Sequence, residues 1–132
     1  MNDLTEIAER IHHSFEDRTA ARDQILAQAR TLTRHCANAI RAIHRNENEL
    51  AQENLVQAES IVKGFRGVRQ DYPELYFVGY TQDALKEYAE ASIVCALIMG
   101  LELPSPEDLG VEFATYLQGL AEAVGELRRR CL

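Results

Sequence analysis

The chain has 132 residues, 46% of them hydrophobic and 27% charged, which is typical of one folded domain and excludes a disordered tail. Its formal net charge of −7 argues against a surface made for general phosphate binding, although a local basic groove is compatible with it. The polar N-terminus, the short apolar run at 91–101 and the widely spaced cysteines argue against a signal peptide, a membrane span and a disulfide framework, so we expect a cytoplasmic protein with no membrane partner.

The first 63 residues contain no glycine or proline. We expect a long helix that begins after a cap at Asp3 or Thr5 and ends near 44–46, either unbroken or with a weak point at 17–19. A second helix is expected over about 47–70 and closes before Pro73, because the residue preceding a proline avoids the α region. Apolar residues of the first helix recur every three or four positions, at Leu4, Ile7, Ile11 and Phe15 and again from Ile25 to Ile43.

The second half of the chain predicts two further long helices. One runs from about 74 or 75 to Met99 and the other from Glu112 to the end, with a single helical turn between Ser105 and Gly110. The apolar side of the last helix is expected at Phe113, Tyr116, Leu117, Leu120, Val124 and Leu127. Short connections between such helices favour an all-α fold, an antiparallel bundle of long helices that forms one domain over residues 1–132.

Three acids in the third long helix have the spacing of one helical stripe. Asp83, Glu87 and Glu90 stand at i, i+4 and i+7, so their carboxylates share a face. An apolar run, 91–99, follows them directly, which predicts that the acids lie close to the protein interior. Acids held together there repel one another unless a proton or a cation intervenes.

A second acidic pair, Glu122 and Glu126, is at i, i+4 in the last helix. A short loop joins the last two long helices, so we expect them to pack antiparallel, with this pair facing Glu87 and Glu90. Four carboxylates would make a hard-oxygen site suited to Mg²⁺ or Mn²⁺. The alternative is a solvated helix face, in which Lys86 and Glu90 are an ordinary i, i+4 pair, and spacing alone favours that alternative.

The most basic part of the chain has no acid between Asp23 and Glu47. Such a stretch is compatible with a nucleic-acid groove, and also with the polar face of a long helix, which spacing alone again favours. The candidate nucleic-acid-binding residues are Arg34, Arg41 and His44 in the first helix and Lys63 and Arg66 in the second.

Several blocks of the sequence resemble the translin/Trax family, especially its prokaryotic members. They are residues 40–45, 71–76, 83–91, 103–110 and 116–127, which follow in the family's order and cover nearly the whole chain. The resemblance implies a translin-like helical domain that forms closed homo-oligomeric shells and binds single-stranded RNA or DNA. Members of the family usually continue into at least one more long helix, so the resemblance implies a domain without the family's C-terminal helix.

The resemblance further implies catalytic acids. Glu87 and Glu90 match a Glu-Tyr-x-Glu motif of the Trax branch, which is a Mg²⁺-dependent endoribonuclease, and Glu122 and Glu126 fall on its two further acids. The family has an aspartate where this chain has Glu122, whose side chain is one methylene longer, so activity below that of the family is one expected outcome. Because the translin branch lacks most of these acids, the chain looks closer to Trax.

Three hypotheses about function follow. The first is a Trax-like endoribonuclease acting on single-stranded RNA, with Glu87, Glu90, Glu122 and Glu126 as metal ligands and catalytic residues around Mg²⁺ or Mn²⁺. The second is a translin-like oligomer that binds single-stranded RNA or DNA without catalysis. The third is an all-α nucleotide pyrophosphohydrolase, because such enzymes also build Mg²⁺ sites from Glu-x-x-Glu and acids of a neighbouring helix.

Overall fold

A computed structural model describes residues 3–131, in which every regular element is a helix, so the predicted all-α class is confirmed. Among these residues, no helix is both long enough and apolar enough to cross a membrane. The elements in chain order are α1 (Leu4–His44), α2 (Asn48–Asp71), α3 (Pro73–Tyr76), α4 (Gly79–Met99), α5 (Pro106–Leu109) and α6 (Phe113–Cys131).

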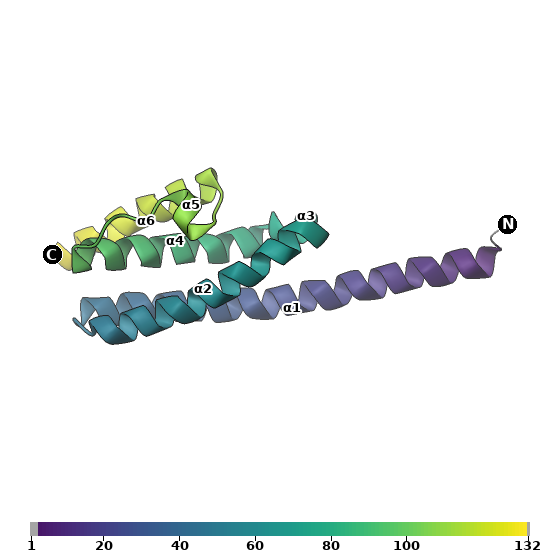
Figure 1. Ribbon diagram of the computed structural model, residues 1–132, viewed down its shortest axis with the longest axis horizontal. Helices are drawn as coiled ribbons and strands as arrows, with labels where there is room; N and C mark the ends of the chain where they lie inside the picture. Colours follow the sequence, from purple (N-terminus) through teal and green to yellow (C-terminus); the bar gives the residue numbers. More distant parts are fainter. Residues whose placement is uncertain (1–2, 132) are drawn as a thin grey trace.

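Helix α1 is one unbroken helix of 41 residues, about 60 Å long at 1.5 Å per residue. Asp3 caps it, accepting a hydrogen bond from the Glu6 backbone N–H at 2.9 Å. Its second half buries Ile25, Leu32 and Ile43, as the apolar repeat predicts. Residues 4–20, the N-terminal arm, are exposed throughout, and the far end of the arm projects beyond the other helices (Figure 1).

Helix α2 turns back along α1 after a tight connection in which Asn46 has a φ of 62°. The two helices run antiparallel, and the His35 ring nitrogen and the Asn54 side-chain oxygen approach to 3.3 Å between them. Ala51, Ala58 and Phe65 are the buried side of α2. This helical hairpin agrees with the predicted antiparallel pair.

The predicted continuous helix from about 74 to 99 is wrong, because Val78 is extended, with φ −69° and ψ 154°, and separates α3 from α4. The break frees two carbonyl groups of α3, and side chains of α4 satisfy them. The Thr81 hydroxyl donates to the Leu75 carbonyl at 2.7 Å, and the Gln82 amide donates to the Tyr76 carbonyl at 2.8 Å.

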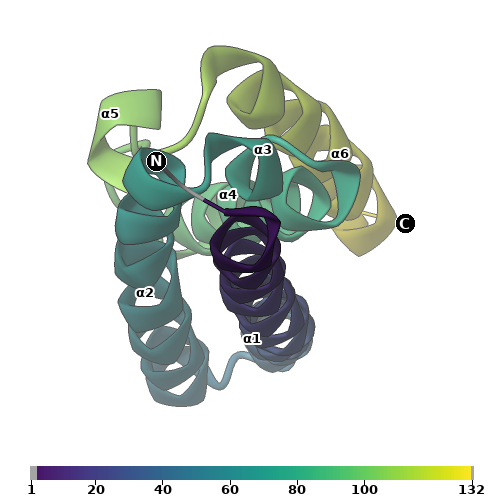
Figure 2. The ribbon, with the colours of Figure 1, turned by 90° about the vertical axis from the view of Figure 1, so that its right-hand side faces the viewer.

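Helix α4 is the central helix of the bundle. Seen end-on, it lies between α1 and α2 on one side and α6 on the other (Figure 2). It is buried on most of its circumference, including the whole stretch from Tyr88 to Ala91. Of the three acids of α4, Glu90 is buried, Glu87 is half-buried and Asp83 is exposed, so the predicted position near the interior is confirmed for Glu90, holds in part for Glu87 and is wrong for Asp83.

The last two long helices are parallel, so the predicted antiparallel packing is wrong. The Thr115 hydroxyl donates to the Gln82 side chain at 2.7 Å near the start of both helices, and Gly119 packs against Ala89 further along both. Residues 100–112, including α5, return along α4 before α6 begins (Figure 1). This segment is long enough to span the bundle, and the Tyr116 hydroxyl anchors it by donating to the Pro104 carbonyl at 2.7 Å.

The buried face of α6 is only partly the one predicted, since Tyr116 is buried and Leu120 packs against the core. Small residues face α4, and the buried set is Thr115, Tyr116, Gly119 and Ala123. Phe113, Leu117 and Val124 of the predicted apolar side are 68%, 63% and 61% exposed. Close packing against α4 selects the small side chains, and the large apolar stripe is left facing outward.

Candidate metal centre

Three of the four predicted acids converge between α4 and α6. Glu87 and Glu90 from α4 and Glu122 from α6 each offer a carboxylate oxygen, and these oxygens lie within 4.8 Å of one another. We call these three residues the acid cluster. Oxygen atoms at such separations are compatible with ligands of a single Mg²⁺ or Mn²⁺ ion.

Gly119 explains why the two helices approach closely enough to form the cluster. A Cβ atom at this position would lie 2.7 Å from the Ala89 Cβ and 3.0 Å from the Glu90 backbone nitrogen, so a side chain would force α6 away. Glu122 follows Gly119 by three residues, which is nearly one helical turn, and is thereby held beside Glu90. The small residue three positions before an acid is the sequence signal for this contact.

Glu90 is the buried member of the cluster, with only 5% of its surface exposed. Burial, followed by hydrogen bonds with Glu122 and Glu87 and by the charge of Glu87, raises the pKa of its carboxyl group to about 8. In the absence of a cation, Glu90 therefore keeps its proton at neutral pH and stabilises the cluster by donating a hydrogen bond. A divalent cation would replace that proton.

Helix α1 closes the cluster from the other side with Cys36, which is fully buried. Burial, and next the charge of Glu87, raise the pKa of the Cys36 thiol well above its usual range, so the group stays a neutral thiol. It contributes an apolar wall and not a thiolate ligand. The cluster thus presents oxygen ligands only, the type that suits Mg²⁺ better than a soft metal.

Lys86 contacts two members of the acid cluster, although spacing alone indicates only a partner on the surface of its own helix. Its ammonium lies 2.9 Å from a Glu122 oxygen and 3.7 Å from a Glu87 oxygen. The i, i+4 pair of Lys86 with Glu90 that the surface alternative assumes is replaced by a contact between helices. The hydrogen bond with Glu122 raises the pKa of the Lys86 ammonium more than partial burial lowers it. The group is therefore a permanent cation at neutral pH.

Glu126, the fourth predicted acid, lies outside the cluster. Its carboxylate contacts the His44 ring nitrogen at 3.0 Å and pairs with Arg129. Partial burial raises the pKa of Glu126, but the hydrogen bonds from Arg129 and His44 outweigh it, and the net pKa is lowered. Its role as a metal ligand stays a prediction.

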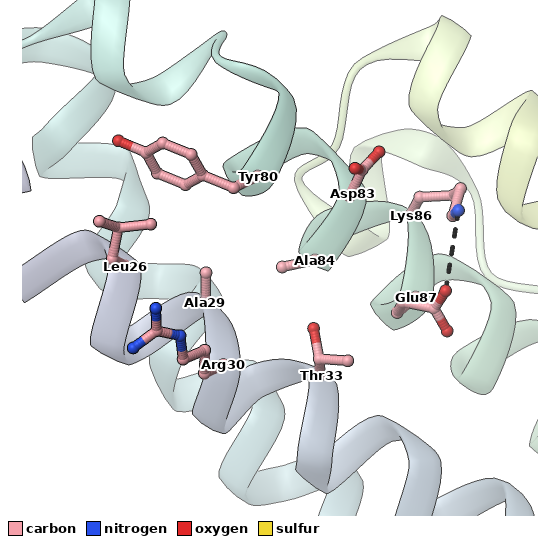
Figure 3. A pocket seen from close by; sticks show the side chains of 9 residues that line it. All are labelled: Leu26, Ala29, Arg30, Thr33, Tyr80, Asp83, Ala84, Lys86 and Glu87. Carbon is pink, nitrogen blue, oxygen red and sulfur yellow. Dashed lines mark ion pairs between the residues drawn. The ribbon is translucent and has the colours of Figure 1, made fainter.

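An open groove of about 600 Å³ adjoins the cluster, between α1 and α4. Figure 3 shows Arg30 and Thr33 on the α1 wall and Asp83, Lys86 and Glu87 on the α4 wall. The Tyr80 hydroxyl at this groove is buried and has no hydrogen-bond partner within residues 3–131. Asp83 is thus a groove residue and not a member of the acid cluster. The groove places a cation and hydrogen-bonding groups next to a carboxylate of the cluster.

The predicted nucleic-acid-binding residues do not gather on one surface. Arg34 and Arg41 are exposed on α1, one and three turns beyond Arg30, which the prediction omitted. Their spacing places all three near one stripe of the helix.

The two candidates on α2 have other neighbours. Lys63 pairs with Glu59 at 3.3 Å, and Arg66 lines a separate cavity of about 470 Å³ with Phe65 and Glu107. His44, the remaining candidate, is bonded to Glu126. The basic stripe of α1 is therefore the part of the predicted set that borders the groove.

Known proteins share this arrangement of helices, although no family model matches the chain. The chain is 30% identical, over 88% of its length, to an uncharacterised protein of Methanocaldococcus jannaschii. The crystal structure of AfC3PO aligns with 93% of the chain at 35% identity and a TM-score of 0.85. A complex of AfC3PO with duplex RNA aligns over the same share with a TM-score of 0.83. Apo-NeC3PO aligns with 98% of the chain at 22% identity and a TM-score of 0.81, which supports the fold alone.

These similarities define the class as an all-α bundle with the fold of C3PO, the complex of translin and Trax. The likeness to AfC3PO at 35% identity supports membership of the translin/Trax family, as the motifs of the chain indicate. It covers 52% of the Methanocaldococcus relative, 63% of the AfC3PO chain and 67% of the NeC3PO chain. Its assignment to the Trax branch stays a prediction.

Proposed function

We propose that this chain is a Trax-like, Mg²⁺-dependent endoribonuclease that acts on single-stranded RNA. Glu87, Glu90 and Glu122 would hold the ion, which Mn²⁺ can replace. The observation that carries the proposal is their convergence within 4.8 Å from two helices, with a buried carboxyl group whose pKa is raised to about 8 at its centre. Buried acids with perturbed pKa values concentrate at functional sites.

The groove beside the cluster would receive the RNA backbone. Arg30 and Thr33 on α1 offer a cation and a hydroxyl group, which suit phosphate oxygens. Arg34 and Arg41 continue this stripe along α1. When bound, the metal ion would activate water and stabilise negative charge on the phosphoryl group. The resemblance to the AfC3PO complex with duplex RNA supports RNA as the ligand.

Cleavage of a labelled single-stranded RNA in Mg²⁺, compared with cleavage in EDTA, tests the proposal. We expect cleavage only with the metal, and its loss in Glu87→Gln and Glu90→Gln. Glu53→Gln is the matched control, because Glu53 is an exposed glutamate of α2. Unchanged cleavage in both cluster variants would refute the mechanism, and equal cleavage of a duplex would refute the strand preference.

A translin-like oligomer that binds RNA or DNA without catalysis is the second candidate. It is favoured by the contact of Lys86 with Glu122, which already neutralises part of the cluster, and by the glutamate at position 122. This candidate predicts salt-sensitive binding with no metal-dependent cleavage. The pyrophosphohydrolase alternative predicts release of pyrophosphate from a nucleoside triphosphate. Measurements of nucleic-acid binding and of pyrophosphate release, made beside the cleavage assay, therefore distinguish the three functions.

We also propose that copies of the chain assemble. Two apolar stripes face outward, one on the N-terminal arm and one on α6, and they include Leu4, Ile11 and Phe15 and also Phe113, Leu117 and Val124. Exposed apolar stripes of this kind mark protein contacts. Light scattering should report an oligomer that Phe15→Glu or Leu117→Glu dissociates, while Val56→Glu, at an exposed site on α2, leaves it intact. A monomeric wild-type chain would refute assembly.

A further inference from the structure

We infer that Lys86 is a built-in counter-ion of the acid cluster, which a divalent cation displaces into the groove when it binds. The inference rests on the proposed metal site and adds a residue of this chain that sets how tightly the ion is held. Lys86 would hold the cluster together without metal and would face the nucleic-acid backbone with metal.

The contacts of Lys86 carry the first half of this inference. Its ammonium bridges the two helices, at 2.9 Å from Glu122 on α6 and 3.7 Å from Glu87 on α4. Its side chain is only 20% exposed, which is low for a lysine. The ammonium thus lies between two of the three proposed ligands and balances part of their negative charge.

Charge and geometry make the ammonium and a metal ion compete. An ion bound to the carboxylate oxygens of Glu87 and Glu122 would sit about 2 Å from each, within a few ångströms of the Lys86 nitrogen. Two cations at that distance repel, and an ammonium group has no lone pair with which to bind the ion. Lys86 must therefore leave Glu122 when the ion enters.

The groove gives the displaced side chain a place to go. Lys86 and Glu87 already line it on α4, opposite Arg30 and Thr33 on α1 (Figure 3). A flexible four-carbon stem allows the ammonium to turn towards this open space. There it would add a second cation to that of Arg30, so metal binding would raise the affinity of the groove for a phosphate backbone.

Titration with Mn²⁺, followed by the EPR signal of the free ion, tests the competition. We expect Lys86→Met to bind Mn²⁺ roughly three- to tenfold more tightly than the wild type, since an ion pair of this exposure no longer has to be broken. Lys63→Met is the matched control, because Lys63 pairs with a single glutamate of its own helix, and its Mn²⁺ affinity should equal that of the wild type.

The outcomes separate this inference from the proposed function. Equal or weaker Mn²⁺ binding by Lys86→Met, with normal binding by the wild type, overturns the role of Lys86 and leaves the metal site standing. Absence of Mn²⁺ binding in the wild type overturns both. Lys86→Gln, which keeps a polar side chain, is the second variant if the methionine disturbs folding, and it should also bind more tightly.

Binding of a single-stranded DNA oligonucleotide tests the movement into the groove. We expect Mn²⁺ to increase the affinity of the wild type several-fold more than that of Lys86→Met, because only the wild type gains a cation in the groove. Equal stimulation of both proteins overturns this movement. The comparison is made at one ionic strength, since phosphate contacts depend strongly on salt.

Discussion

Two glutamates of α6, one turn apart, have opposite surroundings. Glu122 joins Glu87 and Glu90 in a cluster of three acids, whereas Glu126 stands between two bases, His44 and Arg129. The pKa of Glu90, at the centre of the first group, is raised to about 8, and that of Glu126 is lowered. Glu126 has a base on each side, whereas the three carboxyl groups of the acid cluster share a single ammonium group, that of Lys86, so the acid cluster is the better candidate for a metal ion.

The parallel packing of α4 and α6 produces this difference. Thr115 pairs with Gln82 near the start of both helices, and Gly119 packs against Ala89 and Glu90 further along both. Glu122 therefore lies near Glu90, and Glu126 lies one turn further along, where α4 has no acid after Glu90. Glu126 instead reaches His44 at the end of α1, so one helical turn separates a candidate metal ligand from a member of an ion pair.

The largest expected effect is on metal affinity. Glu90→Gln should weaken Mn²⁺ binding by roughly a hundredfold or more, because loss of an outer partner of a metal site alone costs roughly ten- to a hundredfold. Glu126→Gln should change it by less than about threefold, if its carboxylate stays with His44 and Arg129. Titration calorimetry on both variants measures this, and equal losses would make Glu126 a fourth ligand, as the sequence predicts.

The next largest effect concerns the approach of the two helices. Gly119→Ala should lower the free energy of unfolding by about 1–3 kcal/mol, the usual cost of overpacking, and weaken Mn²⁺ binding by moving Glu122 away. Gly125→Ala on the same helix is the control, because a Cβ there meets nothing within 4 Å, and it should be neutral or slightly stabilising. Chemical denaturation measures the free energy of unfolding of both variants. Equal values would contradict the close approach of α4 and α6 at Gly119.

The two groups should respond to pH in opposite directions. The raised pKa of Glu90, about 8 against an ordinary 4.5, means that the folded chain binds the extra proton, so its contribution to stability falls as pH rises from about 4.5 to about 8. The lowered pKa of Glu126 stabilises the fold above the ordinary pKa and is lost as pH falls through the folded value. Unfolding measured without metal at a series of pH values should no longer show the fall in stability between about pH 4.5 and about 8 in Glu90→Gln. The same fall in this variant would contradict its assignment to Glu90.

Metal binding should release the carboxyl proton of Glu90. Because Mn²⁺ would replace the proton of Glu90, its affinity should rise with pH up to about 8 and binding should release about one proton. Calorimetry in buffers of different ionisation enthalpy counts the released protons. Release of none near pH 7 would mean that Glu90 is already ionised in the metal-free chain.

The smallest expected effect is the loss of the contacts of Glu126 with His44 and Arg129. Glu126→Gln should lower the free energy of unfolding by about 0.5–1 kcal/mol at neutral pH, since the pairs that it breaks are partly exposed. The loss should vanish in acid, where the carboxylate is protonated in any case. A larger loss at pH 7 would indicate that His44 and Arg129 depend on Glu126 more than their contacts indicate.

Helical periodicity was enough to predict α1, α2, α5 and the stripe of Glu87 and Glu90, because these follow from spacing and capping within one segment. The direction of α6 was not predictable in this way. Residues 100–112 are short in sequence, yet they return along α4. The sequence nonetheless predicts Glu122 opposite Glu90, since that contact depends on which faces meet. It also predicts Glu126 there, whereas the structure pairs Glu126 with His44 and Arg129, because its neighbours depend on the direction of α6.

Other features depended on contacts that spacing cannot reveal. Val78 interrupts a pattern that favours helix, because Thr81 and Gln82 supply side-chain donors to the freed carbonyls. The apolar stripe of α6 faces outward because Gly119 and its small neighbours pack more closely against α4. Lys86 appears in sequence as a partner within its own helix, and only the position of α6 gives it Glu122.

The most direct test of the metal centre is a crystal structure of the protein soaked in Mn²⁺, with the ion located by its anomalous scattering. We predict one ion bound to carboxylate oxygens of Glu87, Glu90 and Glu122, with Glu126 still paired to His44. An acid cluster without an ion, in which Lys86 keeps its contact with Glu122 at a Mn²⁺ concentration that supports cleavage, would contradict the account.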